Sequence, residues 1–265
     1  MQELYQVFIL AIIQGLTEFL PVSSSAHLIL IPKLLHWPDQ GLAFDVAIHV
    51  GTLFSVITYF RKELKLMIVD WCKSIPGKPA TPNSHLAWAI GFGTIPVGLA
   101  GLVFSSFIAN DMRATWIIAA STIGFGILLG IASLVAKQKR DERHLKWKDV
   151  LVIGCAQAIA LIPGTSRSGI TLTAGLFVGL TRQAAARYSF LLSIPVIILA
   201  GSLEMFKLAQ SDLIIDYRAL GFGFIVSMIT GYACIGVFLK LLERFGVMPF
   251  VIYRVVLGTV LLFIL

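Results

Sequence analysis

The sequence predicts an all-α polytopic membrane protein with six transmembrane helices and two re-entrant helix hairpins. Of its 265 residues, 57% are hydrophobic and only 13% are charged, against about 25% charged in a typical soluble domain. Apolar runs of roughly 20 residues, enough to cross a bilayer core, recur along the chain. Lys and Arg gather in two segments, Arg61–Lys78 and Lys137–Lys148, a pattern typical of cytoplasmic loops.

Six apolar segments are each long enough to span the bilayer. We expect them to form a single integral membrane domain over residues 1–265. We expect the first apolar segment not to be a cleavable signal peptide, because it lacks preceding basic residues and Glu18 and Pro21 interrupt it. The six segments are Gly41–Phe60, Leu86–Ile108, Ala114–Ala136, Arg187–Leu208, Tyr217–Leu239 and Met248–Leu265.

Two further apolar regions are interrupted. Leu4–Leu35 is broken by Pro21 and three serines, and Val150–Leu180 is broken by the sequence PGTSRSG. Each half has only about 14 to 17 residues, which is short for a membrane span. We therefore expect each region to enter the membrane and return on the same face.

The charges of the loops set the orientation of these elements. With both basic segments in the cytoplasm, the helices between them turn outside at Ala109–Arg113, and a re-entrant Val150–Leu180 places the acidic loop Gln210–Asp216 outside. A single crossing by Val150–Leu180 would reverse the later loops. Leu4–Leu35 then enters from outside. Further loop charges fit this orientation: Arg182, Arg187, Lys240 and Arg244 are expected inside, and Asp212 and Asp216 outside.

The two interrupted regions resemble each other. Gln14 is followed by Pro21 and VSSSA, and Gln157 by Pro163 and GTSRSG, with spacings that differ by one residue. Together with opposite orientation, this predicts an inverted-topology repeat. Such repeats bring the N-termini of broken helices to an anion near the membrane midplane.

Gln14 and Glu18 lie one turn apart on the first interrupted helix and share a face. A carboxylate at membrane depth is costly and is a candidate functional group. Oxygen donors of this kind suit Mg²⁺ or Ca²⁺, so both residues are candidate metal ligands. Two alternatives for Glu18 are an electrostatic role beside a phosphate and a purely structural ion pair with Arg167.

Three serines and a histidine follow the first break. Ser23, Ser24 and Ser25 sit where a helix begins, so capping explains any one of them. Ser24 and His27 are three residues apart and share a helix face. That spacing predicts a nucleophile with an adjacent base, with Ser23 and Ser25 placed to bind the substrate phosphate.

The segment PGTSRSG, Pro163–Gly169, is the second half of the predicted site. Its glycines allow close approach of a ligand to the backbone, and a helix N-terminus binds anions. Arg167 offers a permanently charged fork suited to phosphate. No Walker motif is present. The residues expected to bind phosphate here are Gly164, Thr165, Ser166 and Ser168.

Other embedded ionisable residues point less directly to function. Asp45 and His49, one turn apart, are expected either to support the site or to hydrogen-bond to each other. Glu204 and Arg254 are expected to extend toward the membrane surface from helix ends. The net charge of +7 comes largely from the two basic segments, which argues against nucleic acid as a partner.

With these motifs the chain resembles the undecaprenyl-diphosphate phosphatase family, bacterial enzymes associated with bacitracin resistance. The resemblance rests on QGLTEFLPVSSSAH (Gln14–His27) and PGTSRSG together, and extends to FLLSIP (Phe190–Pro195) and PFVIYR (Pro249–Arg254). In the family signature Gln14 takes the uncharged form of a Glu or Gln position, and Glu18 matches the following Glu.

The resemblance implies hydrolysis of undecaprenyl diphosphate to the monophosphate and phosphate, which recycles the lipid carrier of cell-wall synthesis. It also implies a divalent cation, the bacterial cytoplasmic membrane, and a pocket open to the extracytoplasmic side. Arg167 would contact the phosphate, while the nucleophile stays open among Ser24, His27 and water. The alternative function is a secondary transporter or flippase for a phosphorylated polyprenyl lipid. The oligomeric state stays open, with a homodimer among the alternatives.

Overall fold

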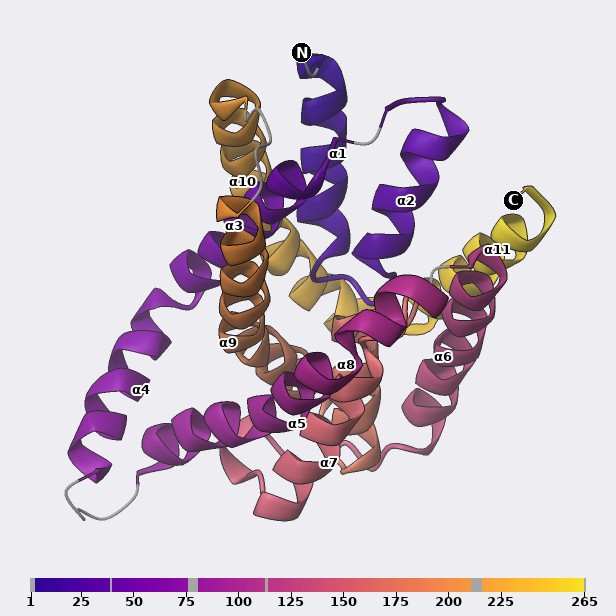
Figure 1. Ribbon diagram of the computed structural model, residues 1–265. Coiled ribbons are helices and arrows are strands. Elements are labelled where there is room, and N and C mark those ends of the chain that lie inside the picture. The colour runs from indigo at the N-terminus through magenta and orange to yellow at the C-terminus, as the bar shows by residue number, and fades with distance from the viewer. Residues whose placement is uncertain (1–2, 39, 76–80, 113, 211–215, 265) are drawn as a thin grey trace.

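The computed structural model describes residues 3–38, 40–75, 81–112, 114–210 and 216–264, and within them the chain is helical (Figure 1). Two pairs of short helices form the hairpins: α1 (Leu4–Thr17) with α2 (Ser24–Leu34), and α7 (Trp147–Ile159) with α8 (Arg167–Phe177). The helices around them are α3 (Leu42–Tyr59), α4 (Arg61–Ser74), α5 (Pro82–Asp111), α6 (Thr115–Val135), α9 (Arg182–Ala209), α10 (Tyr217–Phe245) and α11 (Met248–Ile264), with a 3₁₀ turn at Glu142–His144.

The chain is a multi-pass α-helical membrane protein. Five described helices, α3, α5, α6, α9 and α10, are long and apolar enough to cross a bilayer. Helix α11, the sixth predicted span, has 17 residues and is shorter than these five. The number of six spans therefore stays a prediction.

The distribution of side chains is that of a protein in lipid. Large apolar side chains point outward, among them Leu134 (75% exposed) and Phe263 (86%). The interior holds ionisable and amide groups, including Gln14, Glu18 and Arg254. Polar side chains at membrane depth face the inside of a bundle, because lipid offers them no hydrogen bonds.

Both predicted breaks are confirmed. The chain leaves helical geometry between Thr17 and Ser24, and again between Ile159 and Arg167. The end of the second region lies beside the segment that precedes this region, since the Arg140 amide donates to the Gly179 carbonyl (3.2 Å) and the Thr181 amide donates to the Arg140 carbonyl (2.8 Å). This region therefore returns to the segment that it left.

The two hairpins correspond position by position. Helices α7 and α8 each begin 143 residues after α1 and α2 (position 147 against 4, and 167 against 24). Ser23 and Ser166, related by the same offset, both have positive φ (72° and 67°) and both precede a helix. Ser23 and Ser166 are therefore equivalent positions, whereas Pro21 and Pro163 are not. When the hairpins are aligned on these serines, the one-residue difference in spacing is removed. In Figure 1 the α1–α2 hairpin lies above the α7–α8 hairpin, with both bends toward the centre.

The basic segment Arg61–Lys78 was expected to be a loop, and this is wrong for most of its length. It forms helix α4, because strong helix formers fill it and no glycine or proline precedes Pro76. Asp70 on α4 accepts hydrogen bonds from Thr81 and Asn83 at the start of α5, each 2.9 Å long. Met67 is buried while the basic residues stay outside.

The two expected external turns are described only in part. Helix α5 continues to Asp111, so most of the turn predicted at Ala109–Arg113 is its last turn. Arg113 lies outside the described residues. So do 211–215, which include Asp212 of the predicted acidic loop, and 76–80, which include the end of the first basic segment.

The contact between α7 and α5 gives a test of this packing. A Cβ at Gly154 would lie 2.7 Å from the Gly93 carbonyl oxygen, whereas one at Gly91 on α5 would meet no atom within 4 Å. We expect Gly154→Val to destabilise the protein by about 1–3 kcal/mol, since overpacking strains the backbone. Thermal unfolding in detergent should show a lower Tm for Gly154→Val and little change for Gly91→Ala. Equal Tm values would contradict the close contact.

Candidate active site

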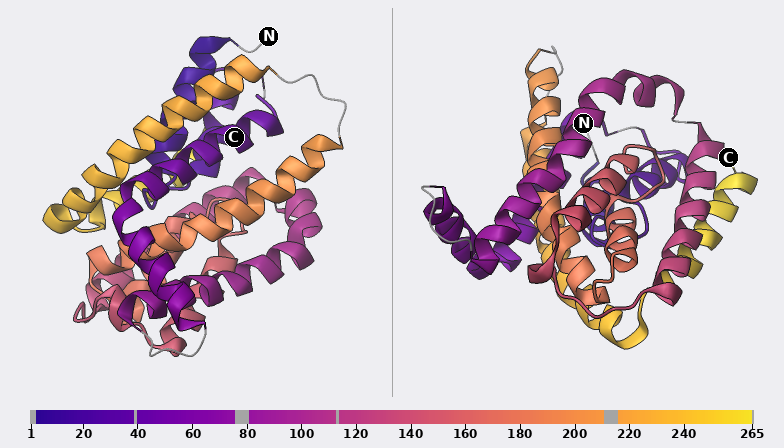
Figure 2. Two further views of the ribbon diagram at one scale, coloured as in Figure 1. Left: turned by 90° about the vertical axis from the view of Figure 1, so that its left-hand side faces the viewer. Right: turned by 90° about the horizontal axis from the view of Figure 1, so that it is seen from below.

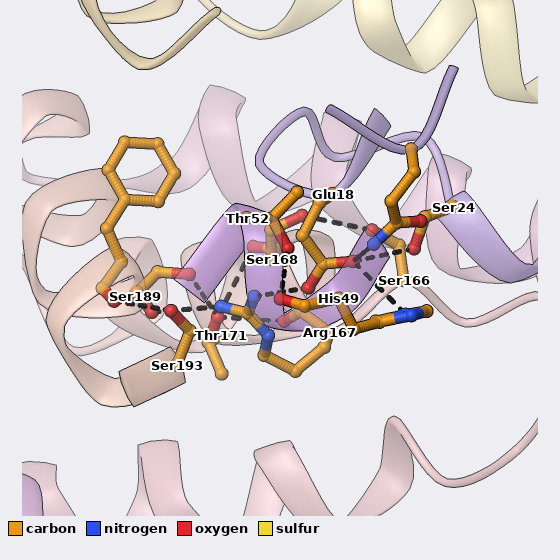
Figure 3. Close-up of polar contacts among 12 residues, drawn as sticks. Glu18, Ser24, His49, Thr52, Ser166, Arg167, Ser168, Thr171, Ser189 and Ser193 are labelled. Carbon is orange, nitrogen blue, oxygen red and sulfur yellow. Dashed lines mark hydrogen bonds and ion pairs between the residues drawn. The ribbon is translucent and has the colours of Figure 1, made fainter. Parts of the chain in front are cut away.

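A cavity of about 360 Å³ lies where the two breaks meet. Polar side chains reach it from the first break and from the N-termini of α2 and α8. Helices α3 and α9 contribute further polar side chains and much of the apolar wall. Its polar lining consists of Glu18, Ser23, Ser24, Ser25, Asp45, His49, Ser166, Arg167 and Glu204. Figure 3 shows several of these side chains converging from separate helices.

Glu18 is the centre of the polar network. It follows the last residue of α1, where the helix opens into the break. One carboxylate oxygen pairs with Arg167 Nη2 (2.9 Å). The other accepts hydrogen bonds from Ser24 Oγ (2.9 Å) and Gln14 Nε2 (3.1 Å). This single buried carboxylate therefore joins residues of both hairpins.

Arg167 is held from its other side by α9. Its Nη1 donates to the Ser189 carbonyl (3.0 Å), while Nη2 pairs with Glu18. Thr171 Oγ1 donates to the Arg167 carbonyl (2.8 Å) and also contacts Ser189 Oγ (2.7 Å). These contacts fix the direction of the guanidinium at the cavity wall (Figure 3). Fixed donors of this kind suit a phosphate group.

Two helix N-termini reach the same cavity. Ser24 begins α2 and Arg167 begins α8, and both residues line the cavity. Ser166 caps α8 by accepting from the Gly169 amide (3.2 Å), but Ser23 makes no such bond at the start of α2. Helix N-termini attract anions through their free amides and their dipoles. The N-termini of α2 and α8 therefore both favour a negatively charged group in the cavity.

The predicted phosphate-binding residues divide into two groups. Ser23, Ser25 and Ser166 line the cavity, as expected of groups that touch a ligand. Gly164, Thr165 and Ser168 are not among the lining residues: the Ser168 hydroxyl donates to the Leu20 carbonyl (2.8 Å), and Gly164 has φ +88°. Ser168 therefore ties the two breaks together behind the cavity wall, and Gly164 and Thr165 are buried away from the cavity.

The expected contact between Ser24 and His27 is absent. His27 Nδ1 donates to the Ser23 carbonyl (2.8 Å), and Nε2 lies 2.6 Å from the Tyr253 hydroxyl. Ser24 is the first residue of α2 and reaches back to Glu18, whereas His27, one turn on, packs against α11. The nearest acceptor for the Ser24 proton is therefore Glu18.

His49 on α3 is the histidine that faces the cavity. Its Nδ1 donates to the Asp45 carbonyl (2.7 Å), which leaves Nε2 free to take a proton, 3.8 Å from Glu18 Oε2. The sequence shows only that His49 and Asp45 are one turn apart. The position of His49 beside Glu18 depends on the packing of segments that are distant in the sequence.

The protein offers few oxygen donors near Glu18. A divalent cation would fit there if oxygens of the substrate completed its coordination. The amide oxygen of Gln14 is buried without a hydrogen-bond partner, beside the Glu18 carboxylate. No group of three or more His, Cys, Asp or Glu side chains that could hold a metal occurs among the described residues. Mg²⁺ is commonly bound by one or two protein oxygens together with substrate phosphates, so this donor set suits it.

Comparison with known proteins shows the family. The family model described as bacitracin resistance protein BacA matches residues 7–260. This chain belongs to that family. BacA relatives that cover nearly the whole chain include undecaprenyl-diphosphatase 2 of Stutzerimonas stutzeri (57% identical; 98% of this chain and 97% of the relative) and undecaprenyl-diphosphatase of Thioalkalivibrio sulfidiphilus (57%; 99% of each). The undecaprenyl-diphosphatase of Aliivibrio salmonicida is 55% identical over 97% of each chain.

The different surroundings of His27 and His49 predict different reactivity. His49 has a 36% exposed side chain and a free ring nitrogen, whereas His27 is 6% exposed and both of its nitrogens are engaged. Diethyl pyrocarbonate should modify His49 and spare His27 in the folded protein, as read by peptide mass spectrometry. Inorganic pyrophosphate should slow labelling of His49 alone. Faster labelling of His27 would contradict the assignment.

Proposed function

We propose that this BacA-family chain hydrolyses undecaprenyl diphosphate to undecaprenyl phosphate and inorganic phosphate. This activity recycles the lipid carrier of cell-wall synthesis and confers resistance to bacitracin. Membership of the family and the names of its relatives support the reaction. The observation that carries the site is the convergence of Arg167 and two helix N-termini on one cavity.

In the bacterial cytoplasmic membrane the chain adopts six transmembrane helices and two re-entrant hairpins. The cavity then opens to the extracytoplasmic side. The basic residues of α4 and of the segment before α7 support this orientation, because positive charge favours the cytoplasmic face. The matched offset of the two hairpins supports the inverted repeat.

The first chemical step uses Ser24 as nucleophile. Its Oγ attacks the terminal phosphorus, the bond to the bridging oxygen breaks, and undecaprenyl phosphate leaves. The Ser24 proton passes to Glu18 Oε2, which already accepts its hydrogen bond at 2.9 Å. Arg167 and the amides at the start of α2 and α8 stabilise charge on the phosphoryl oxygens.

The second step transfers the phosphoryl group to water. Water attacks the phosphorus, the bond to Ser24 Oγ breaks, and Glu18 returns the proton to that oxygen. His49 Nε2 takes a proton from the attacking water, since it is free and faces the cavity. His27 has no part in these proton transfers, because its two nitrogens are engaged with Ser23 and Tyr253.

Glu18 and the Gln14 amide oxygen would hold Mg²⁺ or Ca²⁺ in this proposal. A bound cation would neutralise charge on the diphosphate. In the protein alone, Arg167 balances the charge of Glu18. The Gln14 side chain orients the carboxylate from one turn earlier in α1.

The isoprenoid chain leaves the cavity along its apolar wall. Val46 on α3, Val97 on α5, and Val196, Ile197 and Gly201 on α9 form this wall. Aliphatic contacts of this kind recognise a hydrocarbon chain without polar specificity. The lipid tail therefore remains among the helices while the diphosphate reaches Glu18 and Arg167.

Phosphate release from undecaprenyl diphosphate in detergent tests this function against a transporter, since detergent removes the two compartments. We expect wild-type release that EDTA abolishes and that Mg²⁺ or Ca²⁺ restores. Ser24→Ala should lower the rate by on the order of 10³-fold or more, as for loss of a nucleophile, and Thr259→Ala on the exposed side of α11 serves as control. Near wild-type turnover by Ser24→Ala would exclude Ser24 as nucleophile and leave His27 or water in that role. Lipid binding without release by the wild type would favour the transporter.

Arg167 should be needed to stabilise the transition state. Arg167→Ala removes the cation that faces the cavity, so kcat/KM should fall by about 10²-fold or more, as on loss of one donor to a developing oxyanion. Arg167→Lys keeps the charge but loses the planar fork and should recover only part of the rate. Steady-state kinetics of both variants measure this. Activity of Arg167→Ala within a few-fold of wild type would remove Arg167 from the mechanism.

A further inference from the structure

Arg254 on α11 is completely buried. It was expected to extend to the membrane surface, and this is wrong. Among the described residues it forms no ion pair with a carboxylate. Its hydrogen bonds all go to main-chain carbonyls: Nε to Thr122 (3.0 Å), Nη2 to Gly164 (3.0 Å) and Ser121 (3.5 Å), and Nη1 to Pro21 (3.4 Å).

Two of these carbonyls belong to the two breaks. Pro21 is three residues after Glu18, and Gly164 is three residues before Arg167. The backbone in a break lacks helical hydrogen bonds, and a buried carbonyl without a donor is costly at membrane depth. Arg254 thus supplies donors to both breaks from a third, separate helix.

Two glycines leave room for the buried Arg254 side chain. A Cβ at Gly126 on α6 would lie 2.9 Å from Arg254 Cβ, and one at Gly169 on α8 would lie 2.8 Å from Nη1. Any larger residue at either position would occupy the space of the side chain. The same part of α6 also holds the second break, since Ser121 Oγ donates to the Pro163 carbonyl and Thr122 Oγ1 donates to that of Gly164 (3.2 Å).

We propose that Arg254 is a positioning residue for the phosphatase site: by donating to carbonyls of both breaks, it sets the distance and direction at which Glu18 and Arg167 meet. It touches neither the cavity nor the substrate. A guanidinium has five N–H donors in a planar fork, and Arg254 uses them on three segments at once. A lysine ammonium has three donors on one atom and reaches fewer of these carbonyls.

The inference rests on the proposed phosphatase function, so kinetics and an activity-independent measurement are combined. The full-length variants are Arg254→Met, which removes all donors, and Arg254→Lys, which keeps charge. Ile252→Met on the same helix is the matched control, because Ile252 is 62% exposed. For each variant we measure kcat and KM, together with the rise in Tm that inorganic pyrophosphate produces.

We expect Arg254→Met to lower kcat about 10²-fold, because small displacements of reacting groups cost that much. Arg254→Lys should recover part of the loss, and both variants should lose most of the pyrophosphate-induced rise in Tm. Ile252→Met should behave as wild type in both measurements. A lower Tm with wild-type kcat in the folded protein would show a merely structural role and overturn the proposal.

A double-mutant cycle covers the case in which Arg254→Met does not fold. Ser168 Oγ also ties the breaks, through the Leu20 carbonyl. If Arg254 and Ser168 align the same groups, the kcat losses of Arg254→Lys and Ser168→Ala should be less than additive when combined. Full additivity, or a wild-type kcat for Arg254→Lys, would overturn the proposal. Absence of phosphate release by the wild type would instead overturn the proposed function.

Discussion

The buried ion pair between Glu18 and Arg167 is the interaction on which the rest of the site depends. It joins two hairpins that are far apart in the sequence, and each partner has further fixed contacts, Glu18 with Ser24 and Arg167 with Ser189. A buried carboxylate without its partner would be strongly unfavourable, so the pair constrains how the breaks meet. In the proposed mechanism, a phosphate competes with Glu18 for a guanidinium that Ser189 already holds in place.

The breaks and their principal charges could be predicted from the sequence because their signals are local. Pro21 and Gly164 interrupt apolar runs, and a Glu or an Arg within such a run is a candidate functional residue. The correspondence of the two hairpins was visible only in part, since the prolines suggest a register that the backbone does not follow. The positive φ of Ser23 and Ser166 establishes the true one.

Other features depend on contacts that no local pattern reveals. His49 reaches Glu18 only because α3 packs beside α1, and His27 turns away because Tyr253 is available on α11. Arg254 looks like a residue near a helix end, but α6 and the two breaks enclose it. Helix α4 was missed because its many charges resemble those of a basic loop.

The two hairpins carry different residues at the equivalent positions that line the site. Glu18 corresponds to Leu161 and Ser24 to Arg167 at the fixed offset between the hairpins. Positions 18, 24, 161 and 167 all line the cavity, so two identical halves would place two carboxylates or two arginines in its wall, without opposite charges. Because the halves differ at these positions, the cavity has a carboxylate on one side and a guanidinium on the other. In the proposed mechanism, one half contributes the nucleophile Ser24 and its proton acceptor Glu18, and the other contributes the cation Arg167.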